Sequence, residues 1–239
     1  SEFAEYGTAG HTLGEMCLTQ ELPAKTFKGE ILNRSEHFPD GFEVDDEMID
    51  AVQTYVDYCN QLPDDGRMIE EKMEDGRLIE EKVDFSEWVP EGFGTADFIA
   101  IDDDILGKRT IQVVDLKMGK GVKVNAENNP QGMLYALGCL DRFVADPEDV
   151  VRIAIVQPRL DHISEWEITV KELLEWAVKV VKKKAGEAWA GIMKFSPGEK
   201  QCRFCKASAT CKALAEQSLQ TAMDIFTDIP TRGDLKQIH

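Results

Sequence analysis

The sequence predicts a mixed α/β (α+β) domain in which helices flank a central β-sheet. Two observations support this fold class. Residues 44–62 carry apolar side chains at helical spacing, for example Met48, Val52 and Val56. Short runs such as "TADFIAI" and "VVRIAIVQ" have instead the length and the β-branched composition of strands. Because both patterns occur along one chain of 239 residues, we expect helices packed on a sheet around a full core.

The expected helices are marked by apolar periodicity and by residues that favour helix ends. The first covers residues 8–22 and has Thr8 as a suitable N-cap. A later helix has Asn129 as its N-cap and Pro130 at its first position. The other expected helices are those at 44–62, 171–192 and 207–224.

The expected strands are short apolar segments bounded by turn residues. Residues 66–85 contain two copies of one motif, "GRMIEEK" and "GRLIEEK", and the Asp75-Gly76 turn between them favours an antiparallel hairpin. "TADFIAI" and "TIQVV" follow as a second strand pair, with a polar turn around Gly107. The last two expected strands are "VVRIAIVQ" and "SEWEITV".

The charge of the chain excludes some classes of function. Its 27 Lys and Arg residues stand against 45 Asp and Glu residues, which gives a net charge of −18. This excess opposes non-specific binding to polyanions and argues against a protein that simply coats DNA. It leaves open an enzyme whose carboxylates hold cations that meet phosphate groups. No apolar run is long enough to cross a membrane and no signal peptide is present, so we expect a cytoplasmic protein without membrane contact.

The second strand pair places charged residues at the end of an apolar wall. If its turn is centred near Leu106, Asp97 lies opposite Asp115. Lys117 then follows on the same face, roughly 7 Å further along the strand. The register is self-consistent because it also pairs apolar residues, namely Ile99 with Val113 and Ile101 with Ile111.

Such a cluster of charges indicates a particular chemistry. Two facing carboxylates repel each other unless a proton or a cation lies between them. Hard oxygen ligands suit Mg²⁺ or Mn²⁺, and a lysine beside such an ion can orient a water or stabilise charge on a phosphate. The plainer alternative is a solvated hairpin end at the surface. Because the flanking strands are apolar on both faces, we favour burial and a metal-dependent site that cleaves phosphodiesters.

An ordered set of short motifs resembles a known superfamily. "GTAD" is followed by "VVDLK", and Gln131 and Tyr135 lie four residues apart on the next expected helix. Together they resemble the PD-(D/E)XK nuclease superfamily, and most closely its RecB-like branch, which includes iron–sulfur CRISPR-associated exonucleases. "GTAGH" and "NPQGMLYALG" are also similar to a prophage-encoded relative, and the resemblance covers most of residues 7–211. It implies a restriction-endonuclease-like core with elements in the order αβββαβ, which agrees with the expected elements.

The resemblance implies roles for the residues that match its motifs. His11 would be a metal ligand from the first helix, and Asp97 and Asp115 would be the bridging carboxylates. The backbone carbonyl of Leu116 would complete the shell of a Mg²⁺ or Mn²⁺ ion. Lys117 would be the catalytic lysine.

Further side chains would support this centre. Gln131 and Tyr135, one helical turn apart, would position the DNA backbone or the lysine, and the alternative is that both are ordinary helix residues. Glu80 would support a second metal ion or a water. For His11 the alternative is a capping or surface role. The other histidines, expected at the surface, are His37, His162 and His239.

Three cysteines in "CRFCKASATC" have the spacing C-x2-C-x5-C at Cys202, Cys205 and Cys211. Thiolates this close bind Zn²⁺ or an iron–sulfur cluster, and both normally require four ligands. In the nucleases that the chain resembles, this pattern holds a [4Fe–4S] cluster whose fourth cysteine lies near the N-terminus. Here the fourth ligand is in a segment before Ser1, or is Cys17, or is missing, so we expect the cluster in the intact protein rather than in this chain. The cysteines expected to be buried and free are Cys17, Cys59 and Cys139.

The expected function is a metal-dependent DNA nuclease. By resemblance it is an exonuclease of phage or prophage DNA recombination or processing, in the cytoplasm of a bacterial or phage-infected cell, with DNA as substrate and a recombination protein as partner. We expect one nuclease domain over residues 1–239, with residues 195–225 as a cysteine-bearing appendage. One alternative is a catalytically silent nuclease fold that binds a protein or DNA, which the net charge of −18 favours. Another is an iron–sulfur redox or regulatory protein, which requires a fourth cluster ligand.

Overall fold

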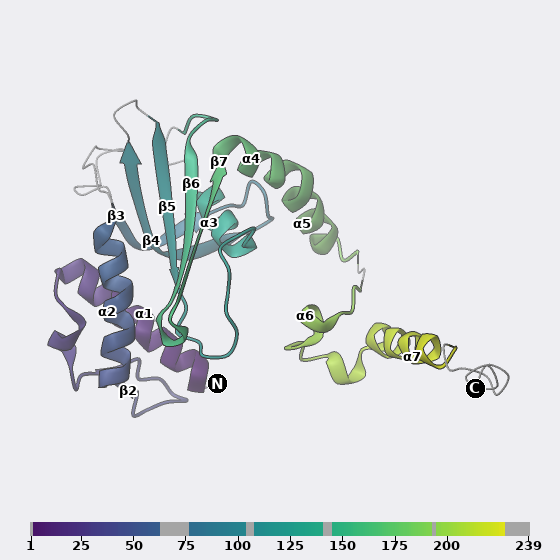
Figure 1. The fold of residues 1–239 in the computed structure, drawn as a ribbon, viewed down its shortest axis with the longest axis horizontal. Helices are drawn as coiled ribbons and strands as arrows, with labels where there is room; N and C mark the ends of the chain where they lie inside the picture. Colours follow the sequence, from purple (N-terminus) through teal and green to yellow (C-terminus); the bar gives the residue numbers. More distant parts are fainter. Residues whose placement is uncertain (1, 63–76, 104–107, 141–144, 193–194, 228–239) are drawn as a thin grey trace, which may run out of the picture. The chain divides into compact units, whose positions relative to one another are not determined.

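The structure is a computed structural model. It describes residues 2–62, 77–103, 108–140, 145–192 and 195–227 (Figure 1). The chain forms two compact units, Ser1–Gly186 (unit 1) and Glu187–His239 (unit 2). The cysteine-bearing segment expected at 195–225 belongs to unit 2, and a single domain over the whole chain stays a prediction.

A five-stranded mixed sheet lies at the centre of unit 1 (Figure 1). Neighbouring strands are antiparallel except for β5 and β6, which are parallel and therefore need a crossover connection. Helix α3 supplies it. From one edge to the other the strands are β3 (Arg77–Asp84), β4 (Phe93–Asp103), β5 (Arg109–Leu116), β6 (Val150–Gln157) and β7 (His162–Thr169).

Shorter strands and the helices complete the two units. A separate two-stranded sheet pairs β1 (Ile31–Leu32) with β2 (Phe42–Glu43). The helices of unit 1 are α1 (Glu2–Gln20), η1 (Ala24–Phe27), α2 (Asp46–Gln61), α3 (Pro130–Leu140), η2 (Pro158–Leu160), α4 (Val170–Trp176), the π-helical η3 (Ala177–Val181) and α5 (Lys182–Trp189), which ends in unit 2. Unit 2 also contains α6 (Glu199–Cys202), η4 (Ser208–Thr210) and α7 (Lys212–Thr227). None of the helices in the described ranges is both long and apolar enough to cross a membrane.

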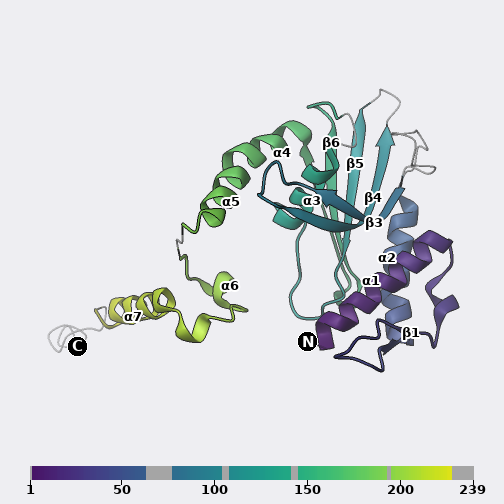
Figure 2. The same cartoon turned by 180° about the vertical axis from the view of Figure 1, so that it is seen from behind.

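Helices cover both faces of the central sheet (Figures 1 and 2). On one face α1 and α2 share a core with Phe98 and Val114. On the other face α3 and α4 share a second core with Ile99 and Val113. This division follows from the period of two in a strand, which sends neighbouring side chains to opposite faces. The expected fold class, a mixed sheet flanked by helices, is confirmed. The order α1, β3, β4, β5, α3, β6 contains the expected αβββαβ core, with α2 inserted after α1.

The predicted hairpin register is also confirmed. Ile99 pairs with Val113 and Ile101 with Ile111 in β4 and β5. The turn around Leu106 lies outside the described residues, as do the first copy of the repeated motif and the Asp75-Gly76 turn. The second copy forms the start of β3, which pairs antiparallel with β4.

Two predicted helix starts differ in outcome. The side-chain oxygen of Asn129 accepts hydrogen bonds from the backbone N–H groups of Gln131 and Gly132, so the predicted cap of α3 is confirmed. The predicted N-cap at Thr8 is wrong, because α1 already begins at Glu2 and the Thr8 hydroxyl donates to the carbonyl of Ala4. The additional turns are supported by a tertiary contact between Tyr6 and the Phe42 ring, whose centroids lie 5.9 Å apart.

Glycines allow α3 to approach the sheet closely. A Cβ atom at Gly138 would lie 2.9 Å from Cβ of Val83 and 3.1 Å from the backbone oxygen of Asp84. Such distances require the backbone of β3 to move, because ordinary carbon contacts are longer. The same atom at Gly186, in α5, would meet nothing within 4 Å.

We therefore predict opposite effects for two alanine substitutions in helices. Gly138→Ala should lower the free energy of unfolding by about 1–3 kcal/mol, because it overpacks the contact between α3 and β3. Gly186→Ala should leave it unchanged or raise it by up to about 1 kcal/mol, because alanine favours the helix and has free space. Urea unfolding of both variants measures the difference. Equal stabilities would contradict the close packing of α3.

Candidate active site

One end of the central sheet gathers polar side chains from several elements. Ion pairs and hydrogen bonds connect them in two sets, and the charges of Asp97 and His11 in the first set also act on Asp115 in the second. The residues are His11 in α1, Glu80 in β3, Asp97 in β4, Asp115 in β5, Lys117 directly after β5, and Gln131 and Tyr135 in α3.

His11, Glu80 and Asp97 form a compact group of possible metal ligands. Nδ1 of His11 lies 3.2 Å from Oδ1 of Asp97 and 3.8 Å from Oε1 of Glu80. One ligand atom from each of the three residues lies within 4.8 Å of the others. In the part of the chain that the structure describes, no second group of His, Cys, Asp or Glu residues meets this condition. Glu80, expected only to support the centre, is thus a member of the group itself.

Small residues bring α1 close enough to place His11 there. A Cβ at Gly10 would lie 2.7 Å from Cγ of Met118, the residue after Lys117. One turn later, a Cβ at Gly14 would lie 3.1 Å from the ring of Tyr55 in α2. The two glycines therefore let α1 lie directly against the segment that carries the lysine. The sequence contains this signal, as two glycines four residues apart on either side of His11, but spacing alone does not say which surface they face.

Asp115 is buried near the end of β5, and Asp97 is buried within β4, next to the last residue pair that β4 forms with β5. Asp97 is 8% exposed and Asp115 is 4% exposed. The backbone N–H of Leu116 donates to Oδ2 of Asp97 at 2.7 Å. Nζ of Lys117 donates to Oδ1 of Asp115 at 2.8 Å. It also lies 2.7 Å from Oδ2 of Asp115, but without the alignment of a hydrogen bond, so among the described residues this buried oxygen has no hydrogen-bond partner.

A hydrogen-bonded chain holds Lys117 from the side of α3. Its Nζ donates to Oε1 of Gln131 at 3.1 Å, and Nε2 of Gln131 donates to the hydroxyl of Tyr135 at 2.9 Å. The Tyr135 ring lies against Gly94, where a Cβ would come within 2.5 Å of the ring. Gly94 was not among the residues expected at the site. Its signal in the sequence is a glycine inside a strand, which often marks a close approach of another group.

The electrostatics of the site follow from burial. Burial and the neighbouring charge of Asp97 raise the pKa of Asp115 to about 6, and Lys117 opposes this shift only in part. For His11, burial alone would lower the pKa. Hydrogen bonds and charges from Asp97 and Glu80 outweigh it and raise the pKa to about 10. The site therefore attracts positive charge, as a proton on His11 or as a cation.

The backbone at Glu80 is strained. Ile79 pairs with Phe98 and Glu81 with Ala96, so Glu80 lies opposite Asp97. Its φ of 49° is in the left-handed region, which a glutamate in a strand rarely adopts. Strain of this kind is concentrated at functional sites, where it directs a side chain. Here the strained residue is Glu80, whose carboxylate lies next to His11.

The donor set fits a divalent cation such as Mg²⁺ or Mn²⁺. Carboxylate oxygens suit both ions, and an imidazole nitrogen suits Mn²⁺ in particular. The three carboxylates of Glu80, Asp97 and Asp115 outnumber the two basic groups, His11 and Lys117, and a cation would balance this excess. Of the expected ligands, His11 and Asp97 converge with Glu80, while Asp115 pairs with Lys117. Ligation by Asp115 and by the carbonyl of Leu116 stays a prediction.

The cysteines and remaining histidines lie elsewhere. The Cys17, Cys59 and Cys139 side chains are buried, as expected, and among the described residues none of them forms a disulfide. In unit 2, Cys202 and Cys211 are partly exposed and Cys205 is exposed, and the three sulfur atoms do not meet the distance condition that the His11 group satisfies. Cluster binding stays a prediction. Among the histidines, His37 is exposed, His162 is partly buried with Nε2 lying 3.0 Å from the carbonyl of Val124, and His239 lies outside the described residues.

Comparison with known proteins identifies a family. A family described as "Protein of unknown function (DUF2800)" matches residues 1–238. The chain belongs to the DUF2800 family. Among solved structures, the crystal structure of SSO0001 is similar at 18% sequence identity and a TM-score of 0.28, over 58% of this chain and 60% of that one. The chain thus spans less than two thirds of the length of SSO0001. Neither description names a reaction or a ligand.

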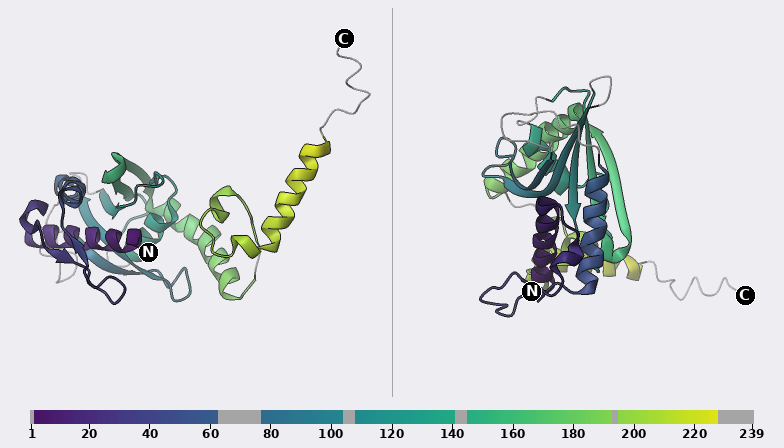
Figure 3. Two further views of the ribbon diagram at one scale, coloured as in Figure 1. Left: turned by 90° about the horizontal axis from the view of Figure 1, so that it is seen from below. Right: turned by 90° about the vertical axis from the view of Figure 1, so that its left-hand side faces the viewer.

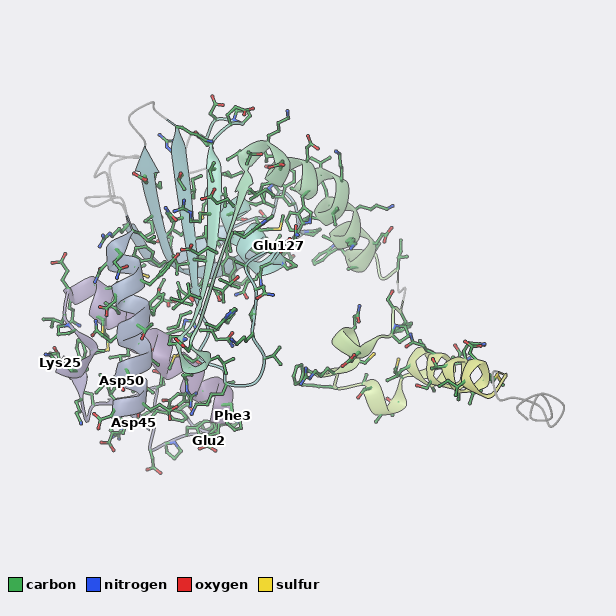
Figure 4. The ribbon with its side chains drawn as sticks, viewed as in Figure 1. Glu2, Phe3, Lys25, Asp45, Asp50 and Glu127 are labelled. Atoms are coloured by element: carbon green, nitrogen blue, oxygen red, sulfur yellow. The ribbon has the colours of Figure 1, made fainter. Side chains whose placement is uncertain are left out.

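We predict that a divalent cation stabilises the folded chain through this site. Saturating Mn²⁺ should raise the melting temperature by several degrees, since binding at about 100 times Kd contributes about 2.7 kcal/mol. Asp97→Asn should lose most of this increase, although its amide oxygen can still accept from Leu116. The control is Asp50→Asn, an exposed aspartate of α2 labelled in Figure 4. Thermal shifts with Mn²⁺ and with EDTA measure the effect. An unchanged shift in Asp97→Asn would exclude this site as the binding site.

The metal-free protein should lose stability as the pH rises. The folded-state pKa of His11, about 10, exceeds its ordinary value of 6.5, so the folded state binds more protons between these values. The stabilisation is complete below pH 6.5 and falls by at most about 1.4 kcal/mol per pH unit above it. Urea unfolding in EDTA at pH 6.5, 7.5 and 8.5 should show a steeper decline for the wild type than for His11→Gln. If the free energy of unfolding depended on pH equally in both proteins, the His11 ion pairs would contribute nothing to stability.

Proposed function

We propose that this DUF2800 protein is a divalent-metal-dependent nuclease that hydrolyses phosphodiester bonds in DNA. One observation carries the proposal. A group of possible metal ligands, His11, Glu80 and Asp97, lies at the same end of the sheet as the ion pair between buried Asp115 and partly exposed Lys117. Metal ligands beside a lysine that is held by carboxylate and amide oxygens are suited to a reaction in which negative charge develops on a phosphate.

The residues would divide the chemistry among them. His11, Glu80 and Asp97 would hold Mg²⁺ or Mn²⁺, with Asp115 contributing its unpartnered oxygen. A divalent cation bound there supplies positive charge to a phosphate and favours ionisation of water. Loss of the proton on His11 accompanies its use as a ligand, because only the neutral imidazole binds a metal.

Lys117 would act on the phosphate directly. Its ammonium group is 29% exposed and lies between the Asp115 carboxylate and the amide oxygen of Gln131. It can donate a hydrogen bond to a phosphate oxygen or orient the attacking water. Gln131 and Tyr135 act through the lysine: they fix the direction of its ammonium group, and the contact of Tyr135 with Gly94 fixes the tyrosine in turn.

The loop between β5 and α3 supplies further positive charge beside the site. Lys120 and Lys123 are exposed on it. The buried side chain of Gln157 holds this loop to the sheet with three hydrogen bonds, to the carbonyls of Gly119 and Val122 and from the N–H of Val124. Lys120 forms an ion pair with Glu47, whereas the exposed Lys123 could contact a phosphate backbone despite the net charge of −18.

Other parts of the proposal rest on resemblance. The choice of DNA, the exonuclease mode, the setting in phage or prophage recombination in the cytoplasm and the recombination partner come from the similarity to RecB-like PD-(D/E)XK nucleases. A [4Fe–4S] cluster on Cys202, Cys205 and Cys211 belongs to the same part of the proposal, with its fourth ligand outside this set.

The net charge favours one alternative, a catalytically silent scaffold. Its acidic surface would then bind a basic partner, and the pair of Asp115 and Lys117 would only stabilise the strand end. This alternative predicts DNA affinity that is independent of divalent metal and is not accompanied by cleavage.

Cleavage of DNA tests the proposal. End-labelled single- and double-stranded DNA should be cut with Mg²⁺ or Mn²⁺ and remain intact with EDTA. Asp115→Asn and Lys117→Ala should each reduce the rate about a hundredfold or more, because each removes a group that acts on the reacting phosphate. Lys183→Ala, on the exposed face of α5, is the matched control and should cleave at the wild-type rate. Undiminished cleavage by Asp115→Asn or Lys117→Ala would exclude this site as the catalytic centre.

A further inference from the structure

A cavity lies apart from the residues of the candidate active site. It has a volume of about 470 Å³ and lies between the first residues of α1 and the segment 37–45. Ligand pockets generally have volumes of roughly 300–1,000 Å³, so it is large enough for a side chain of a partner molecule. Figure 4 labels Glu2 and Asp45, which line the cavity and lie at the same end of unit 1. Figure 3 shows the segment that joins β1 and β2 extending from this end of unit 1.

Three aromatic side chains form the apolar part of the cavity. They are Tyr6, Phe38 and Phe42, and all three are partly buried. The Tyr6 and Phe42 rings meet edge to face with centroids 5.9 Å apart, and the Phe38 and Phe42 rings are tilted with centroids 5.6 Å apart. The rings therefore form one continuous aromatic wall.

The charged side chains that line the cavity are acidic. Glu2, Asp40 and Glu43 are exposed and contribute carboxylates, and no lysine or arginine of the described residues lines it. His37 also lines the cavity, and two arginines contact residues of the lining. A Cβ at Gly41 would meet Cγ of Arg34, and the Arg159 guanidinium stacks on Tyr6. Aromatic faces combined with carboxylates attract cations and repel phosphate groups.

The aromatic wall already binds one guanidinium group within the chain. The Arg159 guanidinium lies 4.6 Å from the centroid of the Tyr6 ring. Its Nη2 also lies 3.0 Å from Oε1 of Glu47. A ring face and a carboxylate together thus hold an arginine at the edge of the cavity. Phe38 and Phe42, with Asp40 and Glu43, offer the same combination without such a partner from the described residues.

The backbone of the cavity is formed before any ligand binds. Ser35 and Phe38 exchange two backbone hydrogen bonds, of 3.0 Å and 3.2 Å, and the hydroxyl of Ser35 accepts a third from the N–H of Phe38. Gly41 has a φ of 66°, and a Cβ there would lie 2.5 Å from the carbonyl oxygen of Leu32, so only glycine fits this turn. A cavity that needs no rearrangement loses less free energy on binding.

We infer that this cavity binds an arginine side chain in a basic segment of a partner protein. The planar guanidinium would stack on Phe38 or Phe42, and Asp40 and Glu43 would accept its N–H groups. Lysine is a weaker match because its ammonium group cannot stack or pair with a carboxylate through two parallel hydrogen bonds. The inference does not depend on nuclease activity, because none of these residues belongs to the catalytic site.

Fluorescence anisotropy of labelled peptides tests the inference with the full chain. A tetra-arginine peptide should bind more tightly than a tetra-lysine peptide, while a tetra-glutamate peptide should not bind. The double variant Asp40→Asn with Glu43→Gln should weaken tetra-arginine binding about tenfold or more. Phe38→Leu, which keeps an apolar side chain but removes the ring, should weaken it severalfold.

Control variants distinguish binding at the cavity from a non-specific attraction of the basic peptide to an acidic protein. Glu87→Gln with Glu148→Gln makes a closely matched change of net charge at two exposed positions away from the cavity, and should change the affinity less than twofold. Equal weakening by the control pair, or no effect of Phe38→Leu, would overturn the inference. Equal binding of tetra-lysine, or binding of tetra-glutamate, would overturn it as well.

Discussion

Asp97, within β4, and Asp115, near the end of β5, are both buried, and the structure around them serves to compensate their charge. A buried carboxylate without partners is strongly unfavourable, so each must be paired, hydrogen-bonded or protonated. Asp97 accepts a hydrogen bond from the backbone N–H of Leu116 and lies next to His11, and Asp115 accepts a hydrogen bond from the ammonium group of Lys117. The compensation is incomplete, because burial still raises the pKa of Asp115 and one of its oxygens lacks a hydrogen bond. A divalent cation bound there would supply the positive charge that the site lacks.

The site takes its residues from both faces of the sheet. α1 contributes His11 from the face where it packs with α2, while α3 contributes Gln131 and Tyr135 from the opposite face. Such an arrangement is available only at a strand end, since the sheet itself separates the two cores elsewhere. It also explains the role of the glycines, because Gly10 and Gly94 allow a helix and an aromatic ring to reach the strand ends without a clash.

The charges of unit 1 are distributed to suit two different ligands. Lysines lie beside the candidate active site, on the loop that Gln157 holds, whereas carboxylates surround the aromatic cavity near the start of α1. Phosphate would be attracted to the first region and repelled from the second, and the reverse holds for a basic peptide. A DNA substrate and a basic partner protein would therefore not compete for one surface, and a net charge of −18 is compatible with both.

Local patterns in the sequence determined the strands, the register of β4 against β5, and the cap at Asn129. Period-two alternation and capping depend on residues that are neighbours along the chain, so a single sequence contains the information. The start of α1, the entry of Glu80 into the ligand group, the pairing of Asp115 with Lys117 and the aromatic cavity were decided by tertiary structure. Apart from the pairing of Asp115 with Lys117, which are two residues apart, each depends on the packing of segments far apart in sequence, such as Tyr6 on Phe42, Gly10 on Met118 and Gly94 on Tyr135. Spacing along the chain identifies which residues could meet, but only the packed structure fixes the distances between them.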